Sequence, residues 1–403
     1  MAEGQGRGGV LYCTLLIRVS LVMGPVRLLH SQPYPSLMLR RNFLSLSSRT
    51  TGVALAAGAL APRVWAAATK SKPLGVALVG LGNYSTRQLA KAFNETTECR
   101  LTGVVSGDPV KAKRWAAEHG FAESGVYNYE NFDSIANNPD IDIVYIVLPN
   151  SMHLEFIERA AAAGKQVICE KPMTVTGAES RRAIKACADA GVLLSVGYRL
   201  QFDPNYRALM LARGTPELGE VRYVQADMAF PIGDPTQWRL RKPLAGGGAM
   251  YDVGVYCTQS ARFFAGQEPV AVTAQEYKTD LVKFAEVDET IMFQLEFPNG
   301  TTANCTTSYA FRSNSVHVDY QKGTGMLSPA HSYGPIKGTL KNEELAPREF
   351  SQQALQMDDF ARCVRAGVES EVSGLEGLKD MLVVDAIYRS IAAGSKRTLV
   401  EPV

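Results

Sequence analysis

The sequence predicts an α/β protein in which a doubly wound parallel sheet is followed by an α+β domain with a large open, mostly antiparallel sheet. Over residues 72–195, short apolar segments of strand length alternate with helical segments, and over residues 196–403 several strand-like segments follow one another. The length of 403 residues also exceeds what one hydrophobic core usually holds, so we expect two domains.

The composition limits the class of protein. With 46% hydrophobic and 20% charged residues, neither a disordered chain nor a bundle of membrane helices is indicated. The net charge of +2 argues against nucleic acid as the main partner. None of the seven cysteines forms a Cys-x-x-Cys pair or a Cys/His cluster with metal-ligand spacing, so we expect buried thiols and no metal site.

Residues 1–68 are predicted to hold an upstream extension and a twin-arginine signal peptide. Arg40 and Arg41 precede a modest apolar run over residues 50–61, and small residues follow at 66–68, the spacing that a signal peptidase reads. A membrane anchor is the alternative, but a bilayer core of ~30 Å needs about 20 apolar helical residues, more than this run supplies. We therefore expect export of the folded protein to the periplasm without stable membrane insertion.

A dinucleotide-binding turn is predicted where the first strand, residues 75–80, meets a helix over residues 86–94. Gly80 permits a tight turn, Gly82 lets the backbone approach a pyrophosphate, and the start of the helix supplies N–H groups. Ser85 stands where a third glycine is usual and is small enough for helix–strand contact. An ordinary glycine turn is the alternative for these residues taken alone.

The elements that follow favour the nucleotide site. Strands are expected at residues 100–105, 141–148 and 166–169, and helices at residues 109–120 and up to residue 163. Strands and helices that alternate at this spacing predict a Rossmann domain over residues 72–195, with its ligand at the carboxyl ends of the strands.

The end of the second predicted strand favours NADP over NAD. NAD enzymes place Asp or Glu there to bind the ribose, whereas here Ser106 and Gly107 follow the strand and Lys111 lies nearby. Because no carboxylate stands there to repel it, the 2′-phosphate of NADP fits this position. Asp108 keeps NAD open as the alternative, since it comes only two residues after Ser106.

Lys171 is the first candidate catalytic residue. With Glu170, it directly follows the strand at residues 166–169, so its ammonium is expected near the nicotinamide. A cation at that position lowers the barrier to alkoxide-like charge as hydride leaves an alcohol. A surface lysine in a turn is the structural alternative.

Asp252 and Tyr256 form the second candidate cluster, behind three glycines at residues 246–248. Their i, i+4 spacing puts both side chains on one face of a helix. A lysine ammonium nearby would stabilise the phenolate, so Tyr256 could carry the proton while Asp252 orients the lysine or the substrate hydroxyls. A helix cap followed by a core tyrosine is the alternative.

The second domain, residues 196–403, is predicted to bind the substrate and to form the subunit interface. Its strands are expected over residues 220–230, 270–279, 287–297, 301–310 and 315–320, and its C-terminal helices over residues 351–366 and 375–393.

The chain resembles one known family in a set of motifs that occur in one order from about residue 74 to residue 400. These are the glycine turn at 80–82, residues 148–153, the Glu-Lys-Pro motif at 170–172, Gly-Tyr-Arg at 197–199, residues 238–241, and the three glycines with Asp252 and Tyr256. Together they resemble the Gfo/Idh/MocA oxidoreductase family, and most of all its glucose-fructose oxidoreductase branch.

The resemblance implies a site and a cofactor. It implies Lys171 near the nicotinamide, and Tyr256 as the acid–base residue where most of the family have histidine. It also implies NADP bound through Ser106 and Lys111, and a structural or cofactor-side position for His153 instead of direct proton transfer. The residues of the cofactor cleft implied in this way are Gly80, Gly82, Asn83, Tyr84, Ser106, Gly107, Lys111, Tyr129, Pro149, Asn150, His153, Glu170, Lys171, Arg199, Trp238 and Arg239.

The function expected from these residues is hydride transfer between bound NADP(H) and sugars. An aldose would be oxidised at C1 to its lactone and a second sugar reduced to an alditol, because an exported enzyme has no cellular NADP pool and must re-oxidise its cofactor in place. The alternatives are a conventional NAD(P)-dependent sugar or inositol dehydrogenase that releases its cofactor, and an NADP-holding sugar-sensing protein. A homodimer or homotetramer is expected through the C-terminal sheet.

Overall fold

A computed structural model describes residues 72–346 and 349–403. The segment that carries the predicted extension and signal peptide, residues 1–68, lies outside these residues. In the described part of the chain, no helix is long and apolar enough to cross a membrane.

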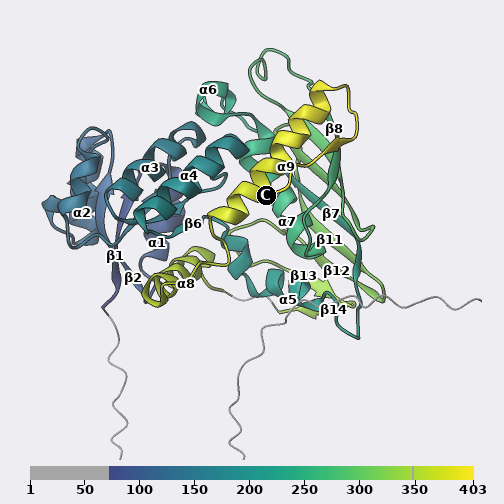
Figure 1. The fold of residues 1–403 in the computed structure, drawn as a ribbon, viewed down its shortest axis with the longest axis horizontal. Coiled ribbons are helices and arrows are strands. Elements are labelled where there is room, and N and C mark those ends of the chain that lie inside the picture. Colours follow the sequence, from purple (N-terminus) through teal and green to yellow (C-terminus); the bar gives the residue numbers. More distant parts are fainter. Residues whose placement is uncertain (1–71, 347–348) are drawn as a thin grey trace, which may run out of the picture. The chain divides into compact units, whose positions relative to one another are not determined.

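The first half of the described chain forms a six-stranded parallel sheet in the order β3-β2-β1-β4-β5-β6 (Figure 1). This order confirms the predicted doubly wound sheet, in which the chain runs outward from β1 in one direction and then in the other. The strands are β1 (Leu74–Val79), β2 (Cys99–Val105), β3 (Val126–Tyr127), β4 (Ile143–Ile146), β5 (Gln166–Cys169) and β6 (Leu194–Val196).

Helices cover both faces of this sheet because its strands are apolar on both sides. Val76 and Leu78 of β1 face one cluster, and Ala77 and Val79 face the other. The α-helices that follow β1, β2, β4 and β5 are, in this order, α1 (Ala90–Ala92, after a π-type turn at Ser85–Leu89), α2 (Pro109–His119), α3 (His153–Ala162) and α4 (Gly177–Ala190). Both faces are therefore buried, as expected for parallel strands.

The C-terminal helix α8 (Gln352–Ala366) also packs on the first sheet. Met357 and Phe360 of α8 belong to the same buried cluster as Val76 and Leu78 of β1. The chain thus returns from the second half to complete the core of the first (Figure 1).

The second half forms a nine-stranded sheet in the order β14-β13-β12-β11-β7-β10-β9-β8-β15. Only β7 and β10 pair in parallel, so the predicted mostly antiparallel sheet is confirmed. Its strands are β7 (Val221–Ala229), β8 (Ala271–Tyr277), β9 (Thr290–Glu296), β10 (Thr302–Ser308), β11 (Ser313–Tyr320), β12 (Gly323–Leu327), β13 (Gly338–Leu340), β14 (Glu343–Leu345) and β15 (Thr398–Leu399).

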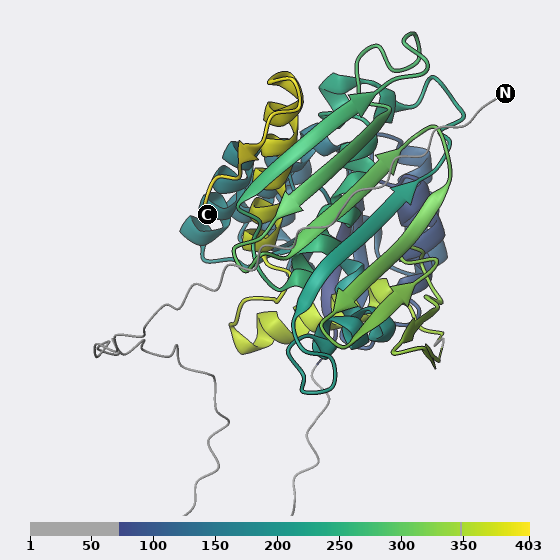
Figure 2. The same cartoon turned by 90° about the vertical axis from the view of Figure 1, so that its right-hand side faces the viewer.

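One face of this sheet carries helices, and Figure 2 shows the sheet from its other face, with the helices behind. The helices of this half are α5 (Pro204–Ala212), α6 (Lys242–Ala245), α7 (Val255–Ala265) and α9 (Gly374–Ala392). Helix α7 packs on β7 and β10, and α9 packs on β8. Alternate residues of the strands are buried, as in β9, where Ile291, Phe293 and Leu295 point into the core.

The six cysteines of the described residues carry free thiols, and only Cys363 is partly exposed. Burial raises the pKa of Cys99 and of Cys187 to about 12. These thiols therefore act as small core residues and not as nucleophiles.

Candidate active site

The glycine turn after β1 is shaped by two short-range contacts. Gly80 has φ +94°, and a Cβ at this position would lie 2.4 Å from the carbonyl oxygen of Val147 on the neighbouring strand connection, so only glycine fits. The Ser85 hydroxyl donates to the carbonyl oxygen of Gly80 at 2.6 Å, which explains a serine where a third glycine is usual. At Gly82, by contrast, an added Cβ would meet no atom within 4 Å.

The space over Gly82 fits a pyrophosphate. The turn leads at once into the helical segment at Ser85–Leu89, and the first amides of a helix have no partner within the helix. Open space, free amides and the positive end of a helix dipole are the features that hold phosphate groups.

Beside the turn, the end of β2 presents the residues predicted to read the ribose. Asp108 accepts from the backbone N–H of Lys111 at 3.0 Å and so caps α2. The Lys111 ammonium reaches back toward the turn, 3.5 Å from the carbonyl oxygen of Leu81. The ring of Tyr129 covers Gly107, where an added Cβ would lie 3.2 Å from it. Asp108 is thus held by its capping bond, and its own N–H donates to the Ser106 hydroxyl at 3.1 Å, which keeps the three predicted residues together.

Lys171, Asp252 and Tyr256 meet at the carboxyl end of β5. The Lys171 ammonium donates to the backbone carbonyl of Asp252 at 2.6 Å and lies 3.6 Å from its carboxylate. The same ammonium lies 4.9 Å from the centre of the Tyr256 ring. The two predicted clusters, 81 residues apart in the chain, thus form one site.

The Asp252 carboxylate is held ionised by neighbours from three segments. Arg239 donates to Oδ2 at 3.0 Å, and the Tyr309 hydroxyl donates to the same oxygen at 2.9 Å. Burial favours a higher pKa for this carboxyl, but Arg239, Lys171 and Tyr309 together hold it below the ordinary value. Asp252 therefore acts as a fixed negative charge that orients Lys171.

The three glycines let the Asp252 segment enter the core. An added Cβ at Gly248 would lie 1.9 Å from the backbone oxygen of Asp288, so no larger residue fits there. The Asp288 carboxylate accepts from the backbone N–H groups of Gly248 and Met250 at 2.6 and 2.8 Å, which caps the helical segment. That segment begins as a π-type turn, Met250–Gly254, and continues as α7. The prediction that Asp252 and Tyr256 lie on one regular helix is therefore wrong, because Asp252 belongs to the π-type turn and Tyr256 to α7.

Arg199 lies behind Tyr256, with a relative exposure of 2%. It donates to the Tyr256 hydroxyl at 3.3 Å and to the carbonyl oxygens of His331 and Ser332 at 2.8 and 2.7 Å. The ring of Tyr333 lies on its other side, 4.4 Å away.

Two other residues predicted to lie at the cofactor, Asn150 and His153, form hydrogen bonds that join backbone segments of the site. Asn150 donates to the carbonyl oxygen of Ala245 at 2.9 Å, which ties the start of α3 to the glycine segment. The two ring nitrogens of His153 lie 2.8 and 2.9 Å from the carbonyl oxygens of Pro172 and Leu148. His153 is buried, and both of its ring nitrogens face backbone carbonyl oxygens, so its contacts in the structure are with the framework of the site.

The remaining predicted residues lie around the site and contact its framework. Glu170 accepts from the Tyr145 hydroxyl at 2.7 Å, and burial raises the pKa of its carboxyl. The Arg239 guanidinium lies 4.6 Å from the centre of the Trp238 ring. This contact helps to hold Arg239 beside Asp252. Pro149 and Asn83 border the two turns that carry Asn150 and Gly82. The ring of Tyr84 lies 5.8 Å from that of Tyr333, so the glycine turn touches the second half of the chain here.

Several residues of this site were not predicted from the sequence. They are Tyr309 and Asp288, which hold the Asp252 segment, and His331, Ser332, Tyr333 and Gln352, which surround Arg199. Tyr309 directly follows the observed strand β10, at the edge where the site lies, whereas the sequence placed it inside a strand predicted over residues 301–310. The loop that carries His331 to Tyr333 has no pattern that would have marked it.

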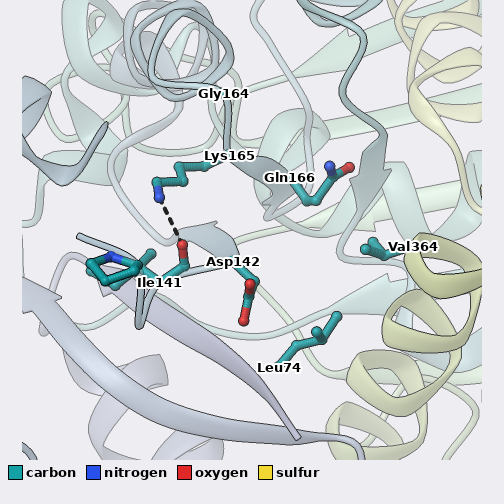
Figure 3. A pocket seen from close by; sticks show the side chains of 8 residues that line it. Leu74, Ile141, Asp142, Gly164, Lys165, Gln166 and Val364 are labelled. Carbon is teal, nitrogen blue, oxygen red and sulfur yellow. Dashed lines mark hydrogen bonds between the residues drawn. The ribbon is translucent and has the colours of Figure 1, made fainter. Parts of the chain in front are cut away.

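A cavity of about 320 Å³ lies at the amino ends of β1, β4 and β5, the opposite end from this site (Figure 3). Its charged groups are already bonded: Lys165 donates to the carbonyl oxygens of Asn138 and Ile141, and Asp142 accepts from the N–H of Gly75. These hydrogen bonds hold the backbone at the amino ends of the strands in place, so the cavity is not a candidate active site. Within residues 72–346 and 349–403, no group of three or more His, Cys, Asp or Glu side chains could hold a metal ion.

Comparisons with known proteins find relatives over most of the chain. Residues 74–198 match the family model described as an oxidoreductase family with an NAD-binding Rossmann fold, and residues 210–324 match the GFO/IDH/MocA C-terminal domain. D-xylose 1-dehydrogenase (NADP+) of Haloarcula marismortui is 32% identical over 329 residues, 79% of this chain and 91% of that protein. Inositol 2-dehydrogenase of Rhizobium meliloti is 28% identical over 320 residues, 75% and 92% of the two chains.

Two solved structures are similar to this chain over most of its length. The aldose-aldose oxidoreductase from Caulobacter crescentus, complexed with glycerol, is 43% identical with a TM-score of 0.77, covering 81% of this chain and 100% of that one. Levoglucosan dehydrogenase, in complex with NADH and L-sorbose, has a TM-score of 0.70 at 21% identity, over 83% and 100% of the two chains, which shows a shared fold.

Proposed function

The chain belongs to the GFO/IDH/MocA family and is a sugar oxidoreductase, and we propose that it transfers hydride in two half-reactions. In the first, an aldose is oxidised at C1 to its lactone. In the second, another sugar is reduced at its carbonyl carbon to an alditol. One observation carries the proposal: Lys171, Asp252 and Tyr256 meet where the strands of the nucleotide-binding sheet end.

NADP held at the glycine turn and by Ser106 and Lys111 would supply the hydride acceptor of the first half-reaction and the hydride donor of the second. Side chains of the protein transfer the proton. In the oxidation, Tyr256 takes the proton of the C1 hydroxyl, while the Lys171 ammonium stabilises the negative charge that develops on that oxygen. In the reduction, Tyr256 returns the proton to the new alcohol, so atoms and electrons balance over the cycle.

Asp252 acts on Lys171. Its backbone oxygen and its carboxylate both approach the ammonium, so the lysine is held toward the ring of Tyr256. Asp252 is itself kept ionised by Arg239 and Tyr309. The three charges are thus arranged before a sugar arrives, which is the condition for electrostatic catalysis.

NADP fits the residues of the nucleotide side. Gly82 leaves open space at a helix start, and Ser106 and the Lys111 ammonium stand where a 2′-phosphate would lie, with the Asp108 carboxylate engaged in capping α2. The NADP-dependent xylose dehydrogenase relative supports the same choice of cofactor. Together with the aldose-aldose oxidoreductase, it also supports sugars as the substrate class.

The two-sugar cycle also fits the proposed export through the twin-arginine route. A periplasmic enzyme meets no pool of NADP, so a cofactor that stays bound must be restored by a second sugar. A conventional NADP-dependent aldose dehydrogenase that releases its cofactor is the second candidate, favoured by the xylose dehydrogenase relative.

The test uses the purified full chain without added nucleotide. The protein is denatured, the released nucleotide is identified, and the intact protein is mixed with glucose or xylose while the absorbance of reduced nicotinamide is followed. Bound NADP that is reduced by one sugar and re-oxidised by another supports the proposal. A protein that purifies without nucleotide, and that turns over only when NADP is supplied, supports the conventional dehydrogenase instead.

Gly82→Ala is expected to weaken nucleotide binding by at least about tenfold without loss of stability, because the added methyl occupies open space that the pyrophosphate needs. Gly233→Ala is the matched control, since a Cβ there also meets no atom within 4 Å and lies away from the turn. Thermal melting and equilibrium titration with NADP measure the two quantities. Wild-type NADP affinity in Gly82→Ala would contradict the assignment of the turn.

A further inference from the structure

Tyr333 lies between the glycine turn and the catalytic residues, in the loop that follows β12. The centre of its ring lies 4.4 Å from the guanidinium carbon of Arg199 and 5.8 Å from the ring centre of Tyr84, which follows the glycine turn. Arg199 in turn donates to the Tyr256 hydroxyl at 3.3 Å. Tyr333 is therefore one side chain away from the nucleotide side and one side chain away from the residue that carries the proton.

The Tyr333 side chain remains accessible although its ring is held in place. Its relative exposure is 48%, whereas Arg199 and Tyr256 are only 2% and 7% exposed. The contact with Arg199 needs only the ring, because a guanidinium is attracted to the face of an aromatic side chain. Within residues 72–346 and 349–403, the Tyr333 hydroxyl has no hydrogen-bond partner. The hydroxyl thus takes no part in the contacts that fix the ring.

The Tyr333 hydroxyl lies on the side of the catalytic groups. Partial burial raises the pKa of Tyr333, and the acidic groups of Tyr256 and Asp252 raise it further. The pKa of Arg239 is raised mainly by Asp252 and to a smaller extent by Tyr333. Because such effects weaken with distance, the hydroxyl end of Tyr333 lies toward the groups around Asp252.

Several other polar side chains of the site are already engaged. Asn150, His153 and Tyr309 have hydrogen-bond partners in the protein. By contrast, the hydroxyl of Tyr84, the ring neighbour of Tyr333, is buried without a partner in the part of the chain that the structure describes. Since a buried tyrosine hydroxyl usually has a partner, two free hydroxyls on neighbouring rings indicate contact with a bound ligand.

A sugar that reacts at C1 carries further hydroxyls that have to be bound. The C1 hydroxyl has to meet Tyr256 and Lys171, so the remaining hydroxyls lie at side chains around this pair. A tyrosine hydroxyl can both donate and accept a hydrogen bond, which suits the alcohol groups of a sugar. Tyr333 presents such a hydroxyl beside the pair, without a protein partner and open to solvent.

We infer that Tyr333 is a specificity-determining residue whose hydroxyl binds a hydroxyl of the aldose away from C1, while its ring stays stacked on Arg199. The inference rests on the proposed function, in which the sugar reacts at Tyr256 and Lys171. It assigns a task to the loop after β12, which the mechanism of hydride transfer does not otherwise use.

The first test compares Tyr333→Phe with the wild type in the oxidation of D-glucose and D-xylose by the NADP-loaded enzyme. Phenylalanine keeps the ring on Arg199 and removes only the hydroxyl. For the better of the two sugars, kcat/KM should fall roughly 3- to 12-fold, the equivalent of one neutral hydrogen bond, and mostly through KM. Tyr277→Phe is the matched control, because this tyrosine of β8 is 49% exposed, and its variant should react like the wild type. A wild-type kcat/KM for both sugars in Tyr333→Phe would overturn the inference.

Deoxy sugars then show whether the lost interaction is with one hydroxyl. Derivatives of the better sugar that each lack one hydroxyl away from C1 are oxidised by the wild type and by Tyr333→Phe. The derivative without the bound hydroxyl should give both proteins the same kcat/KM, because the hydrogen bond is then missing in both. An equal loss for every derivative would contradict the inference, since the hydroxyl would then act on the site as a whole.

Nucleotide binding gives a readout that does not depend on sugar turnover. The dissociation constant of NADP should be unchanged in Tyr333→Phe, and a raised value with an unchanged KM for the sugar would assign the hydroxyl to the cofactor and reject the inference. The failure of the proposed function looks different, because Tyr256→Phe would then oxidise sugars at the wild-type rate. If Tyr256→Phe is inactive while Tyr333→Phe reacts like the wild type, only the inference about Tyr333 fails.

Discussion

Lys171→Met is expected to lower kcat for aldose oxidation by about 10²- to 10⁴-fold. Methionine keeps the length of the side chain but removes the ammonium that lies between the Asp252 carbonyl and the Tyr256 ring. The charge on the substrate oxygen then develops without a partner in a largely buried site, where the Lys171 side chain is 13% exposed. By transition-state arithmetic the loss corresponds to about 3–5 kcal/mol.

The measurement is single-turnover reduction of bound NADP after mixing with sugar, which isolates the chemical step from cofactor exchange. Lys185→Met is the matched control, because this lysine lies on the exposed surface of α4 with a side chain that is 74% exposed, and its variant should react like the wild type. Nucleotide affinity should change little in Lys171→Met. A kcat within a few-fold of the wild-type value would remove Lys171 from the mechanism and with it the proposed chemistry.

The fold was predictable from the sequence where a local pattern decides the structure. Strand β5 begins and ends where the apolar run at residues 166–169 predicted, and helix α2 ends one residue earlier than expected because Gly120 adopts φ +70° and caps it. The long strands of the second sheet were predictable for the same reason, since alternate burial leaves a period of two in the sequence.

The short strands of the second sheet could not be predicted in this way. Strands β13 and β14 have three residues each, and β12 contains two glycines, so none carries enough alternation to be seen. They form because β11 offers an edge to which β12, β13 and β14 add in turn. Pairing between strands, and not the propensity of the residues, decides their structure.

The candidate site was predictable as a set of residues but not as a set of contacts. Lys171 and Tyr256 were expected together because Lys171 directly follows a predicted strand and Tyr256 follows the three glycines, and the structure brings them together. The carbonyl partners of Arg199 come from a loop more than 130 residues away, as the separation of 132 residues to His331 shows. No pattern within one segment encodes such a contact, because it depends on how the loop after β12 packs against the segment that carries Arg199.

The largest loss of stability is expected from Arg262→Met, by about 3–5 kcal/mol. Arg262 of α7 has a side-chain exposure of 1% and binds Asp380 and Glu376 of α9, as well as Glu268 in the connection from α7 to β8. Methionine fills much of the same volume but leaves the buried carboxylate of Asp380, also 1% exposed, without a cation. An unpaired buried charge costs far more than the pair itself contributes.

The free energy of unfolding, measured by denaturant titration, should distinguish this pair from a surface one. Arg389→Met, which breaks an ion pair between exposed side chains of 42% and 60% exposure, should cost only about 0–1 kcal/mol. The double variant with Asp380→Asn should regain part of the loss, because the stranded charge is then absent. Burial raises the pKa of Asp380, so the deficit of Arg262→Met should also shrink as the pH falls toward about 3.9, where protonation removes the charge. A deficit that is equal for both arginines, or that grows on acidification, would show that the network between α7 and α9 does not hold the second domain together.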